Sequence, residues 1–169
     1  MTSILEFYNG KPLKLKNGEE LTLQQILLKD NSWWDGCHDF IQWIFPTRTV
    51  SQYCFDAPIL TEKIARELAK KHLAQFQLNI FRFGEFLDSQ DMITMNHNHL
   101  RITRMIECSS LVTNSVKSDP DLFFLMEIIR KYIPLTKYRI NSVLEGNSVG
   151  LHLCPHTAKY WFEAFYSTW

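Results

Sequence analysis

The sequence predicts an all-α protein, with a single compact helical domain over residues 1–169, about seven helices, and minor or no strand content. Three observations support this class. Apolar residues recur at spacings of three and four along most of the chain after residue 22, as on one face of a helix. Hydrophobic residues make up 46% of the chain, enough for a core. No Gly/Ser-rich or Pro-rich linker divides it.

Turn-forming residues interrupt the first part of the chain. The apolar stretch Ile4 to Tyr8 is followed by Asn9-Gly10-Lys11-Pro12, and Asn17-Gly18 comes soon after. Such pairs favour tight turns. We therefore expect either a small hairpin or a short helix with a loop in this region.

Two helices are expected next, each beginning at a polar capping residue. Thr22 fits the N-cap of a short helix that carries Leu23, Ile26 and Leu27. Asn31 or Ser32 fits the N-cap of a second helix, from Trp33 to Phe45, and Pro46 ends it.

The longest expected helix begins after Thr61 and extends from Glu62 to about Leu87, with Gly84 as the position where it would break. Charged residues cover one face. The apolar face carries Ile64, Leu68, Phe76, Ile80, Phe83 and Leu87.

Four further segments complete the expected fold. A helix is expected from about His97 to Val112, and a second one begins at Asp119-Pro120, because proline fits the first helical position, and continues to about Tyr132. A segment from Lys137 to Glu145 stops at Gly146, and Pro155 opens a last helix that ends at Tyr166.

Charge and cysteine content exclude several classes of protein. The chain has 18 Lys+Arg and 18 Asp+Glu, and this balance argues against a nucleic-acid binder or a membrane-surface protein. No apolar run approaches the length of a membrane span. The four cysteines form no CxxC pair and no secretory leader precedes them, so free thiols and a cytoplasmic location are expected. The oligomeric state stays open.

The segment HDFIQWIFP, His38 to Pro46, is rich in both aromatic and polar residues. On one continuous helix, Asp35, His38, Asp39 and Gln42 would form a polar band along one face. Because buried polar groups need partners, this band either faces a ligand or satisfies loop carbonyls and stabilises the packing.

The segment HNHLRITR, His97 to Arg104, offers a candidate anion site. His97, Arg101, Arg104 and Cys108 are spaced by four, three and four residues, which places them on one helical face. Arginines near a helix N-terminus favour phosphate or carboxylate. The alternative is structural: Arg104 pairs with Glu107, and Arg101 pairs with Asp35 or Asp39.

Metal and cofactor chemistry receive little support. His97 and His99 are one residue apart, and His152, Cys154 and His156 alternate, but the paired short spacings of a structural zinc site do not occur. Walker A, dinucleotide-binding, GxSxG and HExxH motifs are absent. We therefore predict no metal and no cofactor.

Several strings of residues are similar to one known family. In order along the chain they are FYNG from Phe7, HDFIQWIFP from His38, APIL from Ala57, HNHLRITRMI from His97 and KYWFEA from Lys159. This order resembles the conserved domain of the opioid growth factor receptor family, over nearly the whole chain, in the stand-alone form of its microbial members. The resemblance implies an all-α domain that does not span a membrane and, for the animal members, recognition of a small enkephalin peptide.

The leading functional hypothesis is a ligand- or partner-binding module with a polar cleft, for a peptide or a small anion. Six residues would border the cleft: His38, Gln42, Trp43, Asn98, Arg101 and Arg104. The alternative is an enzyme acting on an anionic or phosphorylated substrate, with His38 as general base and Arg101 and Arg104 stabilising negative charge. In a third, purely structural reading, both segments only hold the helices together.

Overall fold

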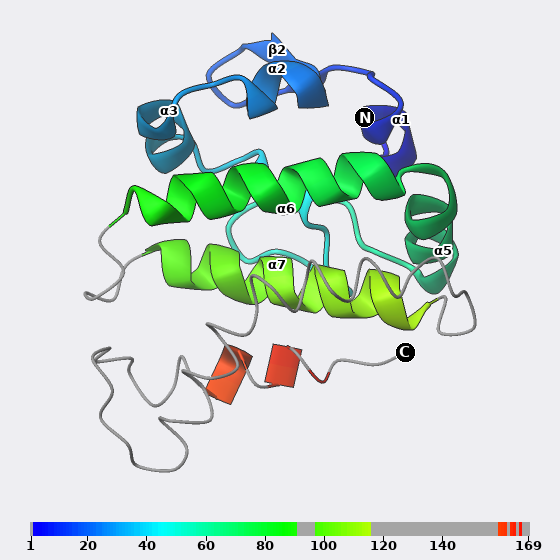
Figure 1. Ribbon diagram of the computed structural model, residues 1–169. Coiled ribbons are helices and arrows are strands. Elements are labelled where there is room, and N and C mark those ends of the chain that lie inside the picture. Colours follow the sequence, from blue (N-terminus) through cyan, green and yellow to red (C-terminus); the bar gives the residue numbers. More distant parts are fainter. Residues whose placement is uncertain (1, 91–96, 116–158, 162, 165, 167–169) are drawn as a thin grey trace.

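The computed structural model describes residues 2–90, 97–115, 159–161, 163, 164 and 166, and most of this part is helical. A small two-stranded sheet lies near the N-terminus (Figure 1). The elements are, in order, α1 (Ile4–Tyr8), β1 (Leu13–Lys14), β2 (Glu20–Leu21), α2 (Leu23–Leu27), α3 (Asn31–Gly36), α4 (Ile41–Ile44), α5 (Glu62–Lys71), α6 (Leu73–Asp88) and α7 (His97–Asn114).

The N-terminal turns produce both a helix and a hairpin. In α1 the Ser3 side chain and Glu6 form a reciprocal capping box, which satisfies two backbone donors at the helix start. Strands β1 and β2 then pair antiparallel, with Leu13 opposite Leu21 and Lys14 opposite Glu20. Gly18, in the loop between the strands, has φ 89°, a conformation that favours glycine.

The prediction of one helix from Trp33 to Phe45 is wrong, because the chain forms two short helices there, α3 and α4. The N-cap of α3 is Asp30, not Asn31 or Ser32, and its carboxylate accepts the Trp33 N–H at 2.8 Å. After α3 the backbone at Cys37 is extended, with φ −93° and ψ 132°. The expected polar band on a single helical face therefore does not exist.

Thr61 caps α5 as predicted, but the following helix breaks at His72 rather than at Gly84. His72 has φ −127° and ψ 20° and separates α5 from α6. The helix expected from about His97 to Val112 is present in the described residues as α7, His97–Asn114. The helices expected over 119–132 and 137–145 lie outside the described residues, and of the last expected helix residues 159–161, 163 and 164 are described as helical.

Aromatic side chains join the N-terminal half to α6. The indole of Trp34 lies 4.9 Å from the Phe40 ring and 5.8 Å from the Phe86 ring, measured between ring centroids. All three side chains are fully buried, and each such burial stabilises the fold by about 1.5–3 kcal/mol. The Trp34 N–H donates to the Ile26 carbonyl at 3.0 Å, so its polar atom is also satisfied.

Helices α6 and α7 cross the middle of the molecule, and α5 contacts both of them (Figure 1). The Tyr8 hydroxyl ties α1 to this core, because it donates to the Ile44 carbonyl at 2.7 Å and accepts from Asn79 at 3.0 Å. Within the described residues, no helix is long and apolar enough to cross a membrane.

Candidate functional site

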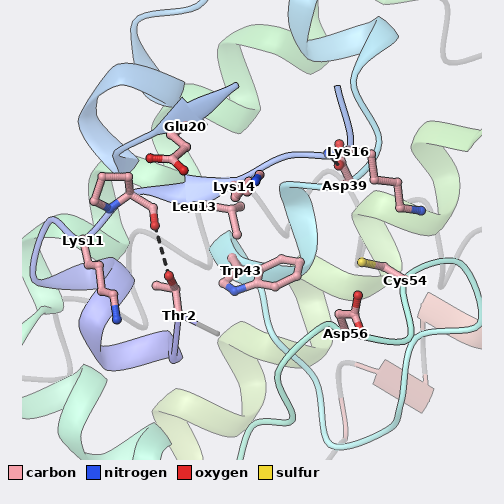
Figure 2. A pocket seen from close by; sticks show the side chains of 11 residues that line it. Thr2, Lys11, Leu13, Lys14, Lys16, Glu20, Asp39, Trp43, Cys54 and Asp56 are labelled. Carbon is pink, nitrogen blue, oxygen red and sulfur yellow. Dashed lines mark hydrogen bonds between the residues drawn. The ribbon is translucent and has the colours of Figure 1, made fainter. Parts of the chain in front are cut away.

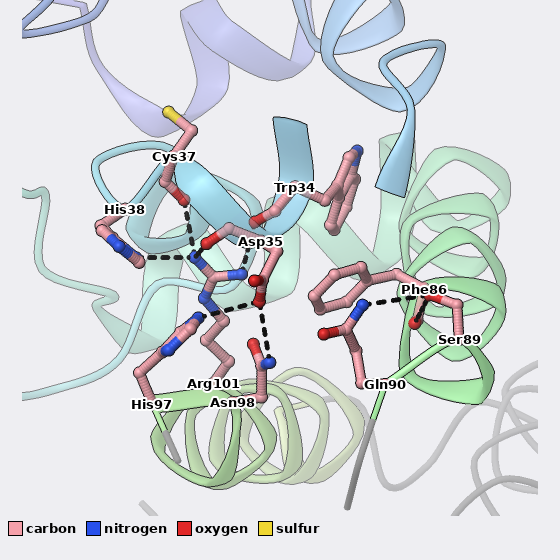
Figure 3. A network of polar contacts seen from close by, with 10 residues as sticks. All are labelled: Trp34, Asp35, Cys37, His38, Phe86, Ser89, Gln90, His97, Asn98 and Arg101. Atoms are coloured by element: carbon pink, nitrogen blue, oxygen red, sulfur yellow. Dashed lines mark hydrogen bonds and ion pairs between the residues drawn. The ribbon is translucent and has the colours of Figure 1, made fainter. Parts of the chain in front are cut away.

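Arg101 on α7 holds the break between α3 and α4 in place. Its side chain is buried, with 4% of the residue exposed. One terminal nitrogen donates to the Trp34 carbonyl at 2.5 Å, and the other donates to the Cys37 carbonyl at 2.6 Å (Figure 3). These carbonyls belong to the end of α3, where helical partners run out. The guanidinium therefore replaces backbone hydrogen bonds that the broken helix cannot make.

The same guanidinium contacts the imidazole of His38, whose Nδ1 lies 2.9 Å from an Arg101 terminal nitrogen. Arginine has only donors, so Nδ1 accepts and the neutral ring carries its proton on Nε2. Although His38 as a whole is exposed, partial desolvation of its ring against Arg101 lowers its pKa, and the charge of Arg101 lowers it further. Burial also lowers the pKa of Arg101, to about 10, which leaves the guanidinium charged at neutral pH.

On the surface side of Arg101, polar groups from α3 and α7 meet. The Asp35 carboxylate lies 3.2 Å from His97 Nε2 and accepts from the Asn98 side chain at 3.2 Å (Figure 3). The rings of His38 and His97 are 4.8 Å apart and edge-on. The two segments singled out in the sequence therefore meet in space, and His38, Asn98 and Arg101 belong to one network.

Arg104 lies one turn further along α7 and also binds the chain after α4. It donates to the Phe45 carbonyl at 3.4 Å and to the Thr47 hydroxyl at 3.2 Å. Burial lowers its pKa. Arg104 forms no ion pair with Glu107 in the part of the chain that the structure describes.

The structural alternative from the sequence, in which Arg101 pairs with the carboxylate of Asp35 or Asp39, differs from the observed contacts. Arg101 meets Asp35 through the main-chain oxygen, at 3.5 Å, and not through the carboxylate. Asp39 is engaged elsewhere, by the Lys16 N–H. The charge of Asp35 nonetheless acts on Arg101 at longer range and favours the charged guanidinium.

Gln42 and Trp43 lie on α4, away from the groups that Arg101 binds. Both are buried, and the Gln42 amide oxygen and the Trp43 indole N–H have no hydrogen-bond partner among the described residues. Trp43 forms a wall of an open pocket of about 590 Å³ (Figure 2). Of the six residues predicted to border a cleft, Trp43 lines this pocket, whereas the other five do not.

The pocket lies between the β1–β2 hairpin and the segment that precedes α5. The hairpin and its approach contribute Lys11, Lys14 and Glu20, and the opposite side carries Cys54 and Asp56 (Figure 2). Sequence reasoning missed this pocket. A recognisable pattern was present, because leucine and lysine alternate from residue 13 to 16, as they do in a strand with one buried face.

Some of the pocket's charged groups already have partners. Lys11 pairs with Glu6 at 2.9 Å, and the Lys16 ammonium donates to the Tyr53 carbonyl at 3.4 Å. The Asp39 carboxylate accepts from the Lys16 N–H at 2.6 Å and from the Cys37 thiol at 3.3 Å.

Three other charged groups that line the pocket have no partner within the described residues. The side chains of Lys14, Glu20 and Asp56 make no hydrogen bond or ion pair there, and all three residues are exposed. Lys14 and Glu20 stand directly opposite each other across the hairpin. The pocket therefore has charged groups of both signs that are available to a ligand.

The described cysteines are protonated at neutral pH. Burial raises the pKa of the Cys37 thiol to about 11 and also raises those of Cys54 and Cys108. Since the thiolate is the reactive form, none of these thiols is activated as a nucleophile. Within the described residues no group of three or more His, Cys, Asp or Glu side chains is placed to hold a metal ion, and His152, Cys154 and His156 lie outside them.

The fold and these sites define a mostly helical protein with an open pocket of mixed charge beside α4. Comparison of the chain with protein-family models, with curated proteins and with solved structures found no match.

Proposed function

We propose that the protein is a ligand-binding module, related to the opioid growth factor receptor-like domains that its sequence resembles, and that the pocket beside α4 is its binding site. The observation that supports this proposal most directly is the pocket itself. Its volume of about 590 Å³ is that of a typical small-molecule site. A buried indole in its wall provides an apolar contact, and uncommitted charges at its edge provide polar ones.

The proposal places the ligand beside Trp43 rather than beside Arg101 and Arg104. An anion site needs donors that point toward the ligand. The Arg101 guanidinium instead points at the carbonyls of Trp34 and Cys37. The Arg104 guanidinium points at the Phe45 carbonyl and the Thr47 hydroxyl. In this proposal, His38, Asn98, Arg101 and Arg104 are scaffold residues that hold α3 and α4 against α7, and so keep Trp43 in position.

The alternative is an enzyme that uses His38 as general base on an anionic or phosphorylated substrate. One observation favours it: His38 is exposed, and its lowered pKa keeps the ring neutral near pH 7. The two arginines that would stabilise negative charge are occupied, however. This alternative predicts that His38→Asn abolishes turnover of phosphorylated model substrates while the protein stays folded.

Indole resonances in a nitrogen-15 NMR spectrum test the binding proposal directly. The Trp43 N–H resonance is assigned with a Trp43→Phe variant, and the protein is titrated with a panel of metabolites and fragments. Trp34 is the internal control, because its N–H is fully buried and bonded to Ile26. We expect at least one compound to shift Trp43 saturably and leave Trp34 unchanged. If every compound in a broad panel leaves Trp43 unmoved, the pocket is not a ligand site.

A further inference from the structure

The outer edge of strand β1 forms one wall of the pocket. The Leu15 N–H donates to the Glu19 carbonyl at 2.8 Å, so the main-chain groups of Leu15 face β2. In an antiparallel pair, the main-chain groups of neighbouring residues point to opposite sides. Those of Pro12, Lys14 and Lys16 therefore face away from β2, and all three residues line the pocket.

Two side chains of the pocket close this edge on either side of Lys14. The Thr2 hydroxyl donates to the Pro12 carbonyl at 3.0 Å (Figure 2). At the other end, the Lys16 N–H donates to the Asp39 carboxylate at 2.6 Å. Within the described residues, no hydrogen bond reaches the main-chain N–H or carbonyl of Lys14 on this edge. One donor and one acceptor of the strand edge are therefore open to the pocket.

An open donor beside an open acceptor on a strand is matched by one residue of a second extended chain. Two residues that form a hydrogen-bonded antiparallel pair exchange both of their main-chain hydrogen bonds. An unpaired strand edge is accordingly a template for an extended peptide. Because the open stretch is only one residue long, it fits a short peptide rather than a long strand.

The segment opposite β1 carries exposed aromatic side chains beside the pocket. Cys54 and Asp56 line the pocket, and Tyr53 and Phe55 flank Cys54 along the chain. These two aromatic residues are 72% and 81% exposed. Neighbouring apolar side chains that are this exposed are typical of surfaces that bind another molecule. They offer apolar contacts to the ends of a peptide that lies in the pocket.

We propose that the outer edge of β1 binds a short extended peptide, one residue of which pairs antiparallel with Lys14. The N–H of that residue donates to the Lys14 carbonyl, and its carbonyl accepts the Lys14 N–H. Recognition then depends on the main chain of the ligand, whose side chains point alternately to the two faces of the hairpin. This inference rests on the proposed function, since it names the ligand class of the same pocket.

Capped tripeptides test this pairing. The probes are acetyl-Val-Xaa-Val amides, with Xaa varied over apolar, polar and charged residues, and the tightest binder is remade with an ester in place of one amide. An ester at Xaa removes the N–H that faces Lys14, whereas an ester at the first valine removes an N–H that faces away from β1. We expect the first ester to bind about tenfold more weakly, because it loses one hydrogen bond, and the second to bind as tightly as the parent peptide.

The Lys14 amide provides a direct readout and a matched pair of variants. Its nitrogen-15 NMR resonance should shift when the peptide binds, and the resonance of Leu15, whose N–H is already bonded to Glu19, should shift less. Lys14→Pro removes the N–H donor at an edge position, where proline is compatible with a strand. Lys14→Gln keeps the N–H and removes only the charge. We expect Lys14→Pro to stay folded and to weaken peptide binding at least about tenfold, and Lys14→Gln to weaken it less.

The outcomes separate this inference from the proposed function. If no tripeptide binds while another compound shifts the Trp43 resonance, or if the two esters bind equally, the peptide assignment is wrong and the pocket remains a ligand site. If analytical ultracentrifugation shows a dimer that Lys14→Pro dissociates, a second copy of the chain occupies the edge instead. If Lys14→Pro unfolds, the two esters still decide. If neither a tripeptide nor any other compound shifts Trp43, both proposals fall.

Discussion

The network around Arg101 and the pocket beside Trp43 use charge in opposite ways. Arg101 is buried, and its terminal nitrogens point at the carbonyls of Trp34 and Cys37 and at the His38 ring. In the pocket, Lys14 and Glu20 are exposed, and their side chains make no hydrogen bond or ion pair in the described part of the chain. The hydrogen-bond donors of Arg101 are therefore used within the fold, whereas the charged side chains of Lys14 and Glu20 are available to a ligand.

This difference shows that an unusual sequence string need not be the binding site. HDFIQWIFP and HNHLRITR stand out because they mix arginine, histidine and aromatic residues. Their arginines are needed where two short helices leave backbone carbonyls without helical partners. The lysines of the hairpin belong to an ordinary strand pattern, yet they border the pocket. The four predictions below test whether stability and binding separate in this way.

The largest expected effect is the loss of stability in Arg101→Met. The substitution keeps an unbranched side chain of similar length but leaves the Trp34 and Cys37 carbonyls unpaired in the interior. An unsatisfied buried group costs about 1–3 kcal/mol, so we expect the free energy of unfolding to fall by about 3 kcal/mol or more. Urea denaturation followed by circular dichroism measures this change.

Two further variants control this experiment. Arg101→Lys keeps the charge but not the planar fork that reaches two carbonyls, so it should recover only part of the loss. Arg66→Ala removes an exposed arginine that pairs with Glu62 on α5, and it should cost about 0.5 kcal/mol or less. If Arg101→Met were no more destabilising than Arg66→Ala, the structural role of the network would be refuted.

Arg104→Met should have a smaller effect than Arg101→Met, although both arginines are on α7. The contacts of Arg104 are longer, 3.4 Å to the Phe45 carbonyl and 3.2 Å to the Thr47 hydroxyl. Hydrogen bonds of this length are weaker, and we expect a loss of about 1–2 kcal/mol by the same urea measurement. Thr47→Val removes one acceptor and should account for part of that loss. A loss equal to that of Arg101→Met would show that contact length does not rank the two arginines.

Local sequence patterns predicted the elements that depend on local interactions. Thr22 and Thr61 cap helices as expected, because a capping side chain bonds to the backbone only three residues away. The break near Cys37 had one local signal, Gly36 at the end of α3, which the prediction of one continuous helix did not use. What local patterns could not show is that the carbonyls exposed by the break are satisfied by Arg101, more than sixty residues along the chain.

The candidate site shows the same limit. The two unusual segments meet in space as the leading hypothesis expected. That hypothesis made Arg101 and Arg104 donors for a ligand, whereas the structural alternative had both segments hold the helices together. A guanidinium can point at a ligand or at a main-chain carbonyl. Which of the two it does depends on where the helices end and leave carbonyls without partners, and the spacing of residues in the sequence does not show those ends. The pocket was missed because its walls come from the hairpin, α4 and the segment before α5, which meet only in the folded chain.

The unfolding free energy should depend on pH through His38, with an effect smaller than those of the two arginines. Burial and Arg101 lower its pKa in the folded protein below the usual value of 6.5. Between the lowered pKa and 6.5 the unfolded chain binds more protons, so the free energy of unfolding falls as the pH falls through this interval.

His38→Asn isolates this contribution, because the asparagine amide keeps an acceptor for Arg101 and does not titrate. Urea denaturation at a series of pH values from 7.5 to below 5 should show a shallower decline in the variant than in the parent protein. Three titratable groups besides Arg101 act on His38: His97, Asp35 and Asp39. The pKa of His72 is also lowered, so His72→Gln is the parallel control for the remaining slope. Identical slopes in His38→Asn and the parent would contradict this prediction.

Removing the pocket charges should change the stability of the protein least. This small change is what would separate the pocket residues from the two arginines, whose loss should destabilise the fold. Lys14→Gln and Glu20→Gln remove exposed groups with no hydrogen bond or ion pair in the described residues, so each should change the free energy of unfolding by no more than about 0.5 kcal/mol. The same variants should weaken binding of a pocket ligand identified by its shift of the Trp43 indole resonance. Arg101→Met should do the reverse: it should destabilise the fold, while the molecules that remain folded retain the hairpin charges. If Lys14→Gln destabilised the protein as much as Arg104→Met, the pocket lysine would be part of the scaffold, and the division between the two regions would be lost.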